Sequence, residues 1–202
     1  MTKGSIRGRR IHFAGSADPD IDPSKLNRFH KLIKHLAKGI LAEGGGLIVT
    51  IGSEPIHQSE HDLPLIFDWT LLEALDECES QGLVSWPDAQ GMPVIAVGLP
   101  RWKVKIPDNR ESLWKRVISA GNIALIQVRS ELSVGGVLRE KQAALGDILV
   151  VAGGGPGVEH LAELYMLNRK PVVPLDITLK TRKSGAAERL STLVMDNHER
   201  FF

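Results

Sequence analysis

Short runs of β-branched and other apolar residues alternate with helical patterns along the whole chain. The runs predict strands at residues 10–15, 47–51, 93–97, 124–128, 147–152 and 170–174. Apolar residues at three- and four-residue spacings predict helices at residues 22–43, 63–78, 112–120, 136–145, 158–167 and 186–198. Because strands joined by helices pair in parallel through right-handed crossovers, we predict an α/β fold. The expected architecture is a doubly wound, mostly parallel sheet with helices on both faces, of the Rossmann-like kind.

Two of these elements carry specific expectations. In the first helix, one apolar stripe is predicted from Leu26, Phe29, Leu32, Ile33, Leu36 and Ile40. The last strand contains Pro171 and Pro174, which cannot donate a ladder hydrogen bond. We therefore expect this strand at an edge of the sheet.

Size and composition limit the organisation of the chain. The 202 residues and 43% hydrophobic content suit one substantial core, so we predict a single domain over residues 1–202. The last helix is predicted to run almost to Phe202, which suggests a piece excised from a longer protein. Cys78, the single cysteine, cannot form an internal disulfide, and no apolar stretch reaches the roughly 18 residues of a membrane span. We expect a cytoplasmic location.

Charge is balanced over the whole chain. Lys and Arg number 25 and Asp and Glu number 24, which leaves a net charge of +1. A chain with this balance has no global electrostatic footprint for nucleic acid or for an anionic membrane. We therefore predict neither a nucleic-acid partner nor a membrane partner, and any functional charge must be local.

A glycine-rich turn is the strongest local motif. Four glycines occupy residues 153–157, between the most apolar strand and a helix. Glycines allow a phosphate to approach the backbone closely, and the following helix N-terminus adds partial positive charge. The alternative is a tight strand-to-helix turn without a ligand. The predicted ligand-binding residues of this turn are Gly153, Gly154, Gly155 and Gly157, with Glu159 in the helix that follows.

Two further small-residue loops follow the first two strands. They contribute Gly15, Ser16 and Ala17 after the first strand, and Gly52 and Ser53 after the second. Carboxyl ends of parallel strands share one sheet edge, so these loops are predicted to complete the ligand site. Arg139, on the helix before the glycine turn, is the predicted cationic partner, although it could equally be a solvated surface residue. Neither a Gly-x-Gly-x-x-Gly after the first strand nor a P-loop is present.

Two other clusters have open interpretations. A basic loop with Trp102 is either a phosphate lid or an ordinary solvated loop, and its cations are Arg101, Lys103, Lys105 and Arg110. His57 and His61 belong to an H-x-x-E-H pattern, but prolines on both sides leave only about two helical turns. We predict a polar loop there and no metal site.

Together these motifs resemble the SLOG superfamily, which joins the DNA-processing proteins to the LOG nucleotide hydrolases. The resemblance covers most of the chain and includes the glycine turn, the loops after the first two strands and the 170–174 strand. It implies a nucleotide or ADP-ribose-type ligand. SLOG modules of bacterial antiviral systems sense NAD-derived nucleotides, so the resemblance further implies a sensor that regulates an effector, forms a homo-oligomer and requires no cofactor.

The chain departs from the LOG hydrolases at one position. Their turn continues with a Thr and then a catalytic Glu two or three residues later, with an Arg on the preceding helix. Here Val158 takes the Thr position and Glu159 follows it directly, whereas Arg139 lies where the Arg is expected. The displaced acid favours binding without turnover. The alternatives are a nucleoside monophosphate phosphoribohydrolase that uses Arg139 and Glu159, and a structural oligomerisation module.

Overall fold

A computed structural model describes residues 5–55, 63–87, 91–99, 106–129, 134–175, 177, 179 and 185–196. The strands are β1 (Arg10–Ser16), β2 (Gly46–Ile51), β3 (Val94–Gly98), β4 (Ile123–Gln127), β5 (Ile148–Gly153) and β6 (Val172–Leu175). The helices are α1 (Pro23–Ala42), α2 (Asp68–Ser80), α3 (Glu111–Ser119), α4 (Val134–Leu145), α5 (Pro156–Leu167) and α6 (Ala186–Asp196), with a short 3₁₀ helix, η1 (Asp108–Arg110), before α3. None of the described helices is long and apolar enough to cross a membrane.

The strands form one parallel sheet in the order β4-β3-β2-β1-β5-β6. From β1 the chain moves outward through β2 and β3 to β4. It then returns through α4 to place β5 on the other side of β1, and continues to β6 at the opposite edge. The predicted doubly wound α/β fold and the predicted edge position of β6 are confirmed. The winding direction reverses between β1 and β5.

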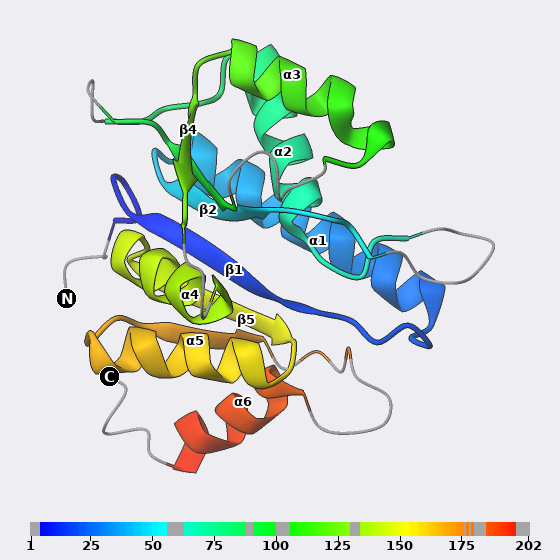
Figure 1. Ribbon diagram of the computed structural model, residues 1–202, viewed down its shortest axis with the longest axis vertical. Coiled ribbons are helices and arrows are strands. Elements are labelled where there is room, and N and C mark those ends of the chain that lie inside the picture. The colour runs from blue at the N-terminus through cyan, green and yellow to red at the C-terminus, as the bar shows by residue number, and fades with distance from the viewer. Residues whose placement is uncertain are drawn as a thin grey trace.

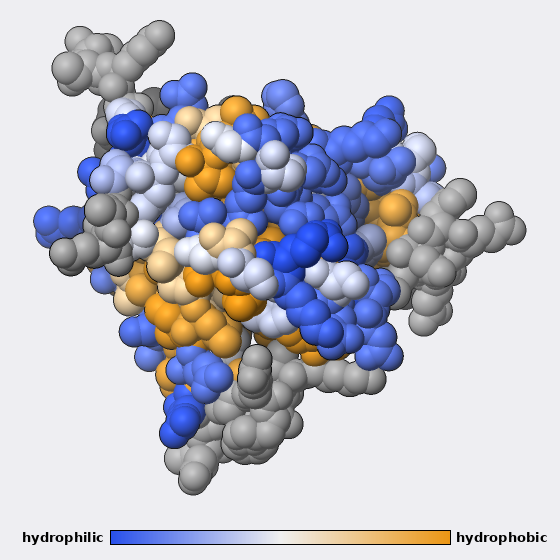
Figure 2. Space-filling model, turned by 90° about the horizontal axis from the view of Figure 1, so that it is seen from above, coloured by the Kyte–Doolittle hydropathy of each residue, from blue (hydrophilic) through white to orange (hydrophobic). Residues whose placement is uncertain are grey.

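Helices cover both faces of the sheet. Helices α1, α2 and α3 lie on one face, and α4, α5 and α6 lie on the other (Figure 1). Each face has its own core: Leu26, Leu47 and Trp69 are fully buried on the first, and Leu149 and Tyr165 on the second. Seen from above, the surface is largely hydrophilic, with smaller separate apolar patches (Figure 2).

Helix α1 begins where its sequence signals predict. The Asp22 side chain accepts a hydrogen bond from the Lys25 N–H, and Pro23 occupies the first turn. The predicted apolar stripe is wrong at two positions, because Leu32 and Leu36 are exposed. They lie about 100° around the helix from Ile33 and Ala37, which take the buried positions instead. The buried residues of α1 are Leu26, Phe29, His30, Ile33, Ala37 and Leu41.

The second helix begins five residues later than predicted, at Asp68 rather than at residue 63. The preceding segment is held by other parts of the chain. The N–H of Leu65 donates to the Pro55 carbonyl, and its carbonyl accepts from the N–H of Ala17. These long-range hydrogen bonds replace the helical ones.

Lys170, just before β6, caps the C-terminus of α4 and does not reach the predicted ligand site. Its Nζ donates to the carbonyl oxygens of Ala143 and Gly146 at 2.6 Å and of Ala144 at 3.2 Å. The last carbonyls of a helix otherwise lack partners, and a cation there also interacts favourably with the helix dipole. This part of the family-like 170–174 segment is therefore structural.

His12 makes the stability of the fold depend on pH. It lies on β1 with its Nδ1 3.3 Å from Tyr165 Oη, and burial lowers its pKa from 6.5 to about 3. His12 binds a proton below about pH 6.5 in the unfolded chain but stays neutral in the folded chain, so the free energy of unfolding falls as the pH drops below 6.5. Between pH 7 and pH 5 we expect this effect of His12 to reduce the free energy of unfolding by about 2 kcal/mol. Urea unfolding of wild type and His12→Asn at both pH values measures this, and an equal pH dependence in the two proteins would contradict it.

Candidate functional site

The end of β1 and the glycine turn meet where the winding of the sheet reverses. Ser16 pairs with Gly153, and its carbonyl accepts from the Gly154 N–H at 3.0 Å. Ligands of open α/β sheets bind outside the strand carboxyl ends at such a reversal. The structure thus places the two predicted loops together at the position that the fold favours for a ligand.

The loop after β1 is used mainly for packing. Gly15 has a φ of +154°, and a Cβ there would overlap with the carbonyl of Ala152 on β5. Ala17 is buried, and its N–H donates to the Leu65 carbonyl. Glycine is therefore required at position 15 by the contact between β1 and β5, whatever ligand the edge binds.

The four glycines of the turn divide into two pairs. Gly153 and Gly154 have φ values of +60° and +81°, and a Cβ on them would lie 2.5 Å from the Ser16 carbonyl oxygen and 2.7 Å from a Val158 methyl carbon, respectively. Gly155, by contrast, has an extended backbone, and a Cβ there would meet nothing within 4 Å. A Cβ on Gly157 would lie 3.4 Å from Arg139 Nη1. The first pair makes the turn, whereas the second borders open surface.

The N-terminus of α5 borders this open surface. Gly155 is its N-cap residue and provides no side-chain cap, and Pro156 has no N–H. Within the described part of the chain, the N–H groups of Gly155 and Gly157 have no hydrogen-bond acceptor. Unpaired N–H groups at the positive end of a helix dipole attract an anion.

Arg139 places its guanidinium between the first turns of α4 and α5. A Cβ added at Gly135 would lie 3.3 Å from its Nη1, and a Cβ added at Gly157 would lie 3.4 Å from it. Its Nε donates to Nδ1 of His160 at 3.1 Å. Among the described residues, no carboxylate forms an ion pair with it. Arg139 is half-buried at the glycine turn and does not lie on a freely solvated helix face.

Glu159 and His160 contact different partners. Glu159 forms an ion pair with Arg189 of α6. His160, which was not among the predicted site residues, contacts Arg139 instead. The sequence did contain one signal for this residue. His160 lies one helical turn after Gly157, and this spacing places it on the same side of α5, which faces α4.

The loop after β2 opens at the same edge. Gly52 has open space around its Cβ position, and Ser53 is exposed. Beneath them, the carboxylate of the half-buried Asp68 accepts a hydrogen bond from the Thr50 N–H at 2.6 Å, and desolvation raises the pKa of Asp68 to about 6. Gln142 donates from α4 to Thr50 Oγ1 at 2.7 Å. Since Gln142 lies three residues after Arg139, this bond holds the Arg139 helix against β2.

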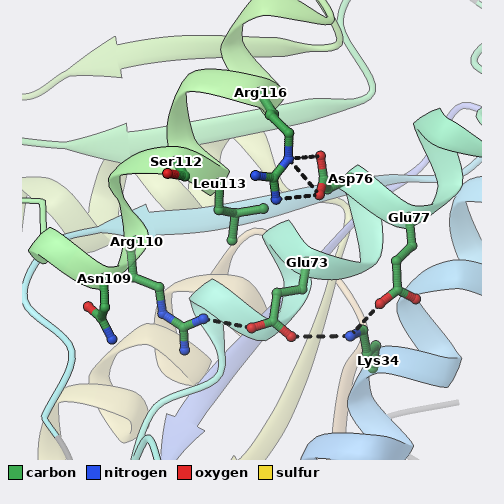
Figure 3. Close-up of a pocket in the computed structure, with 9 residues that line it drawn as sticks. All are labelled: Lys34, Glu73, Asp76, Glu77, Asn109, Arg110, Ser112, Leu113 and Arg116. Atoms are coloured by element: carbon green, nitrogen blue, oxygen red, sulfur yellow. Dashed lines mark hydrogen bonds and ion pairs between the residues drawn. The ribbon is translucent and has the colours of Figure 1, made fainter.

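Arg110 does not serve as a lid cation, and the interpretation of it as part of a phosphate lid is wrong. Its guanidinium is bound to the Glu54 carboxylate at 2.7 and 2.9 Å and to Glu73 at 2.6 Å. Arg110 lines a groove of about 360 Å³ between α1, α2 and α3. Figure 3 shows charged side chains of this groove paired with one another. Both Glu73 and Glu77 contact Lys34 there, and Asp76 contacts Arg116.

The remaining predictions on basic and metal-binding clusters fall outside the described residues. They concern Arg101, Trp102, Lys103 and Lys105 of the basic loop, and His57 and His61 of the H-x-x-E-H pattern. Within the described ranges, no group of three His, Cys, Asp or Glu side chains could hold a metal ion.

The sheet order and the glycine turn at the winding reversal, with Arg139 beside it, define a Rossmann-like module. The chain belongs to the family described as ATP nucleosidase Cap17-like, N-terminal, whose model matches residues 6–200. The resemblance to the SLOG superfamily is thereby confirmed, and the chain is a module of a nucleotide-related family. No curated protein sequence matches the chain significantly.

Solved structures share the fold at low sequence identity. DNA processing protein A from Helicobacter pylori superposes with a TM-score of 0.53 at 14% identity, over 96% of this chain and 74% of that one. The same protein from Streptococcus pneumoniae gives 0.53 at 13% identity, over 95% of this chain and 58% of that one. The protein TM1055 gives 0.51 at 13% identity, over 95% and 88%.

One prediction about partners is overturned by these structures. A nucleic-acid partner was excluded because the net charge is +1. The Helicobacter pylori protein, which shares the fold, has a single-stranded DNA binding mode. Excluding nucleic acid was therefore wrong, because binding to a strand depends on local grooves and side chains and not on the net charge of the chain.

Proposed function

We propose that this chain is a nucleotide-binding module and that its bound nucleotide controls an effector domain. The observation that carries the proposal is the position of Arg139. Arg139 lies at the uncapped N-terminus of α5, where the winding of the sheet reverses, and no carboxylate among the described residues pairs with it. Backbone N–H groups, the helix dipole and a guanidinium together form a binding site for a phosphate.

The proposed function also includes a sensing role. The family description names the N-terminal part of a protein, which supports an effector elsewhere in that protein. We propose that the ligand is a nucleotide or a NAD-derived, cyclic ADP-ribose-type signal and that the module acts in bacterial antiviral defence. We also propose a homo-oligomer and binding without a further cofactor. Calorimetry with ATP, AMP, NAD, ADP-ribose and cyclic ADP-ribose tests the ligand class, and no binding by any of them would favour a purely structural oligomerisation module.

A nucleosidase is the second candidate, because the family is named for one. Cleavage of a glycosidic bond needs a carboxylate or another proton donor or acceptor placed at the ribose. The nearest predicted acid, Glu159, is engaged by Arg189 and does not pair with Arg139. This arrangement supports binding over turnover in this part of the protein.

Glu159→Gln separates the two candidates. Since Glu159 pairs with α6 and not with Arg139, we expect the variant to bind ATP within a few-fold of wild type, and we expect wild type to release no adenine from ATP or AMP. Chromatography of the incubated nucleotides measures base release. Robust release by wild type that is lost in Glu159→Gln would overturn the sensor proposal.

Gly155→Val tests the turn. The Gly155 backbone is extended and a Cβ there meets nothing, so the fold should tolerate valine at a cost of no more than about 1 kcal/mol. The added side chain would occupy the space that a phosphate needs, and we expect ATP binding to become undetectable by calorimetry. Gly154→Val is the contrasting variant, because its φ of +81° and the contact with Val158 should destabilise the protein. Unchanged ATP affinity in a folded Gly155→Val protein would exclude the turn as the phosphate site.

A further inference from the structure

The partner of Arg139 is an imidazole nitrogen and not a carboxylate. Its Nε donates to His160 Nδ1 at 3.1 Å, and this hydrogen bond requires the lone pair of that nitrogen. Two other arginines differ: the half-buried Arg110 is bound by Glu54 and Glu73, and the exposed Arg189 is bound by Glu159. The positive charge of Arg139 is thus left uncompensated by its partner.

The same hydrogen bond sets the direction of the guanidinium. An arginine side chain has many rotamers, and holding Nε from α5 selects among them. In the observed position Nη1 lies 3.3 Å and 3.4 Å from the Cβ positions of Gly135 and Gly157, between two helix N-termini. No described residue accepts a hydrogen bond from either η nitrogen. A planar pair of donors of this kind matches two oxygens of one phosphate.

We infer that His160 is a positioning residue, which orients Arg139 for two oxygens of a nucleotide phosphate and leaves its charge available for them. This inference rests on the proposed nucleotide-binding function and names the ligand group that the site selects. Nucleotides that present a phosphate with two free oxygens gain from the pair. The corresponding nucleoside does not.

Three substitutions at position 160 test geometry and charge separately. In His160→Asn the amide Oδ1 can replace Nδ1 as a neutral acceptor, and we expect ATP affinity within about twofold of wild type. His160→Ala removes the acceptor, and we expect about tenfold weaker binding, the usual loss for one hydrogen bond. His160→Asp keeps an acceptor but neutralises Arg139, and we expect a loss of at least that size. Thermal melts establish that each variant is folded.

A double-mutant cycle identifies the route of the effect. If His160 acts through Arg139, His160→Ala should cause no further loss of ATP affinity in the Arg139→Ala background. Adenosine, which has no phosphate, should bind all of these proteins equally. Additive losses, or an Asn variant as weak as the Ala variant, would overturn the inference.

The outcomes also distinguish the positioning role of His160 from the proposed nucleotide-binding function. If Arg139→Ala weakens ATP binding while His160→Ala binds like wild type, the positioning role is wrong and the phosphate site stands. If wild type binds none of ATP, AMP, NAD, ADP-ribose and cyclic ADP-ribose, the proposed function fails and the inference fails with it.

Discussion

Arg139→Ala is expected to weaken nucleotide binding by about 10- to 150-fold. This corresponds to about 1.5–3 kcal/mol, the usual contribution of a hydrogen bond to a charged group. The guanidinium lies at the N-terminus of α5 without a described carboxylate partner, so a bound phosphate would lose its main cationic contact. Titration with ATP by calorimetry at two salt concentrations measures the loss and its electrostatic part.

Arg116→Ala is the matched control for this experiment. It removes the same charge, but Arg116 pairs with Asp76 in the groove beside α2 and is largely exposed. We expect its ATP affinity to equal that of wild type. An unchanged dissociation constant in Arg139→Ala would instead assign Arg139 no part in phosphate binding, and Arg101, Lys103 and Lys105 would be tested next.

Arg110→Met is expected to lower the free energy of unfolding by about 3 kcal/mol. The Glu54 side chain is 2% exposed, and both of its oxygens accept hydrogen bonds from Arg110. Methionine fills similar space but leaves that buried carboxylate without its partner, and the desolvation cost of the charge is then no longer offset. Urea unfolding of wild type and variant at pH 7 measures the difference.

Two further variants isolate the cause. Adding Glu54→Gln to Arg110→Met removes the unpaired charge and should recover a large part of the loss. Arg116→Met breaks an exposed ion pair and should leave the midpoint nearly unchanged. If Arg110→Met were as stable as wild type, the pair would be a surface contact and not a support for the loop after β2.

Local patterns predicted most of the architecture. The run at residues 147–152 corresponds to β5, in which Leu149, Val151 and Ala152 are buried, and capping by Asp22 marks the start of α1. The α2 boundary was missed because Leu65 hydrogen-bonds to Pro55 and Ala17, which are distant in sequence and give no periodic signal. The stripe on α1 was misjudged at Leu32 and Leu36 because apolar spacing alone does not say which flank of a helix meets the sheet.

The candidate site divides in the same way. Four glycines between a strand and a helix predict a sharp turn near an anion, because glycine adopts φ values such as +60° and +81° without the steric cost of a Cβ. Which of them make the turn and which border open surface depends on Ser16, Val158 and Arg139, which come from three different elements. The sequence therefore predicted the glycine turn, and the packing around it separated the two roles.

By itself the sequence determined the alternation of strands and helices, the parallel α/β class and the turn after β5, because each depends on residues close together in the chain. Only the tertiary structure decided the strand order, the pairing of Arg139 with His160 and of Glu159 with Arg189, and the burial of Arg110 against Glu54. The members of these pairs lie 21, 30 and 56 residues apart. A charged side chain is recognisable from sequence, but its partner is set by which helices and loops the sheet brings together, and that partner decides whether its charge remains available to a ligand.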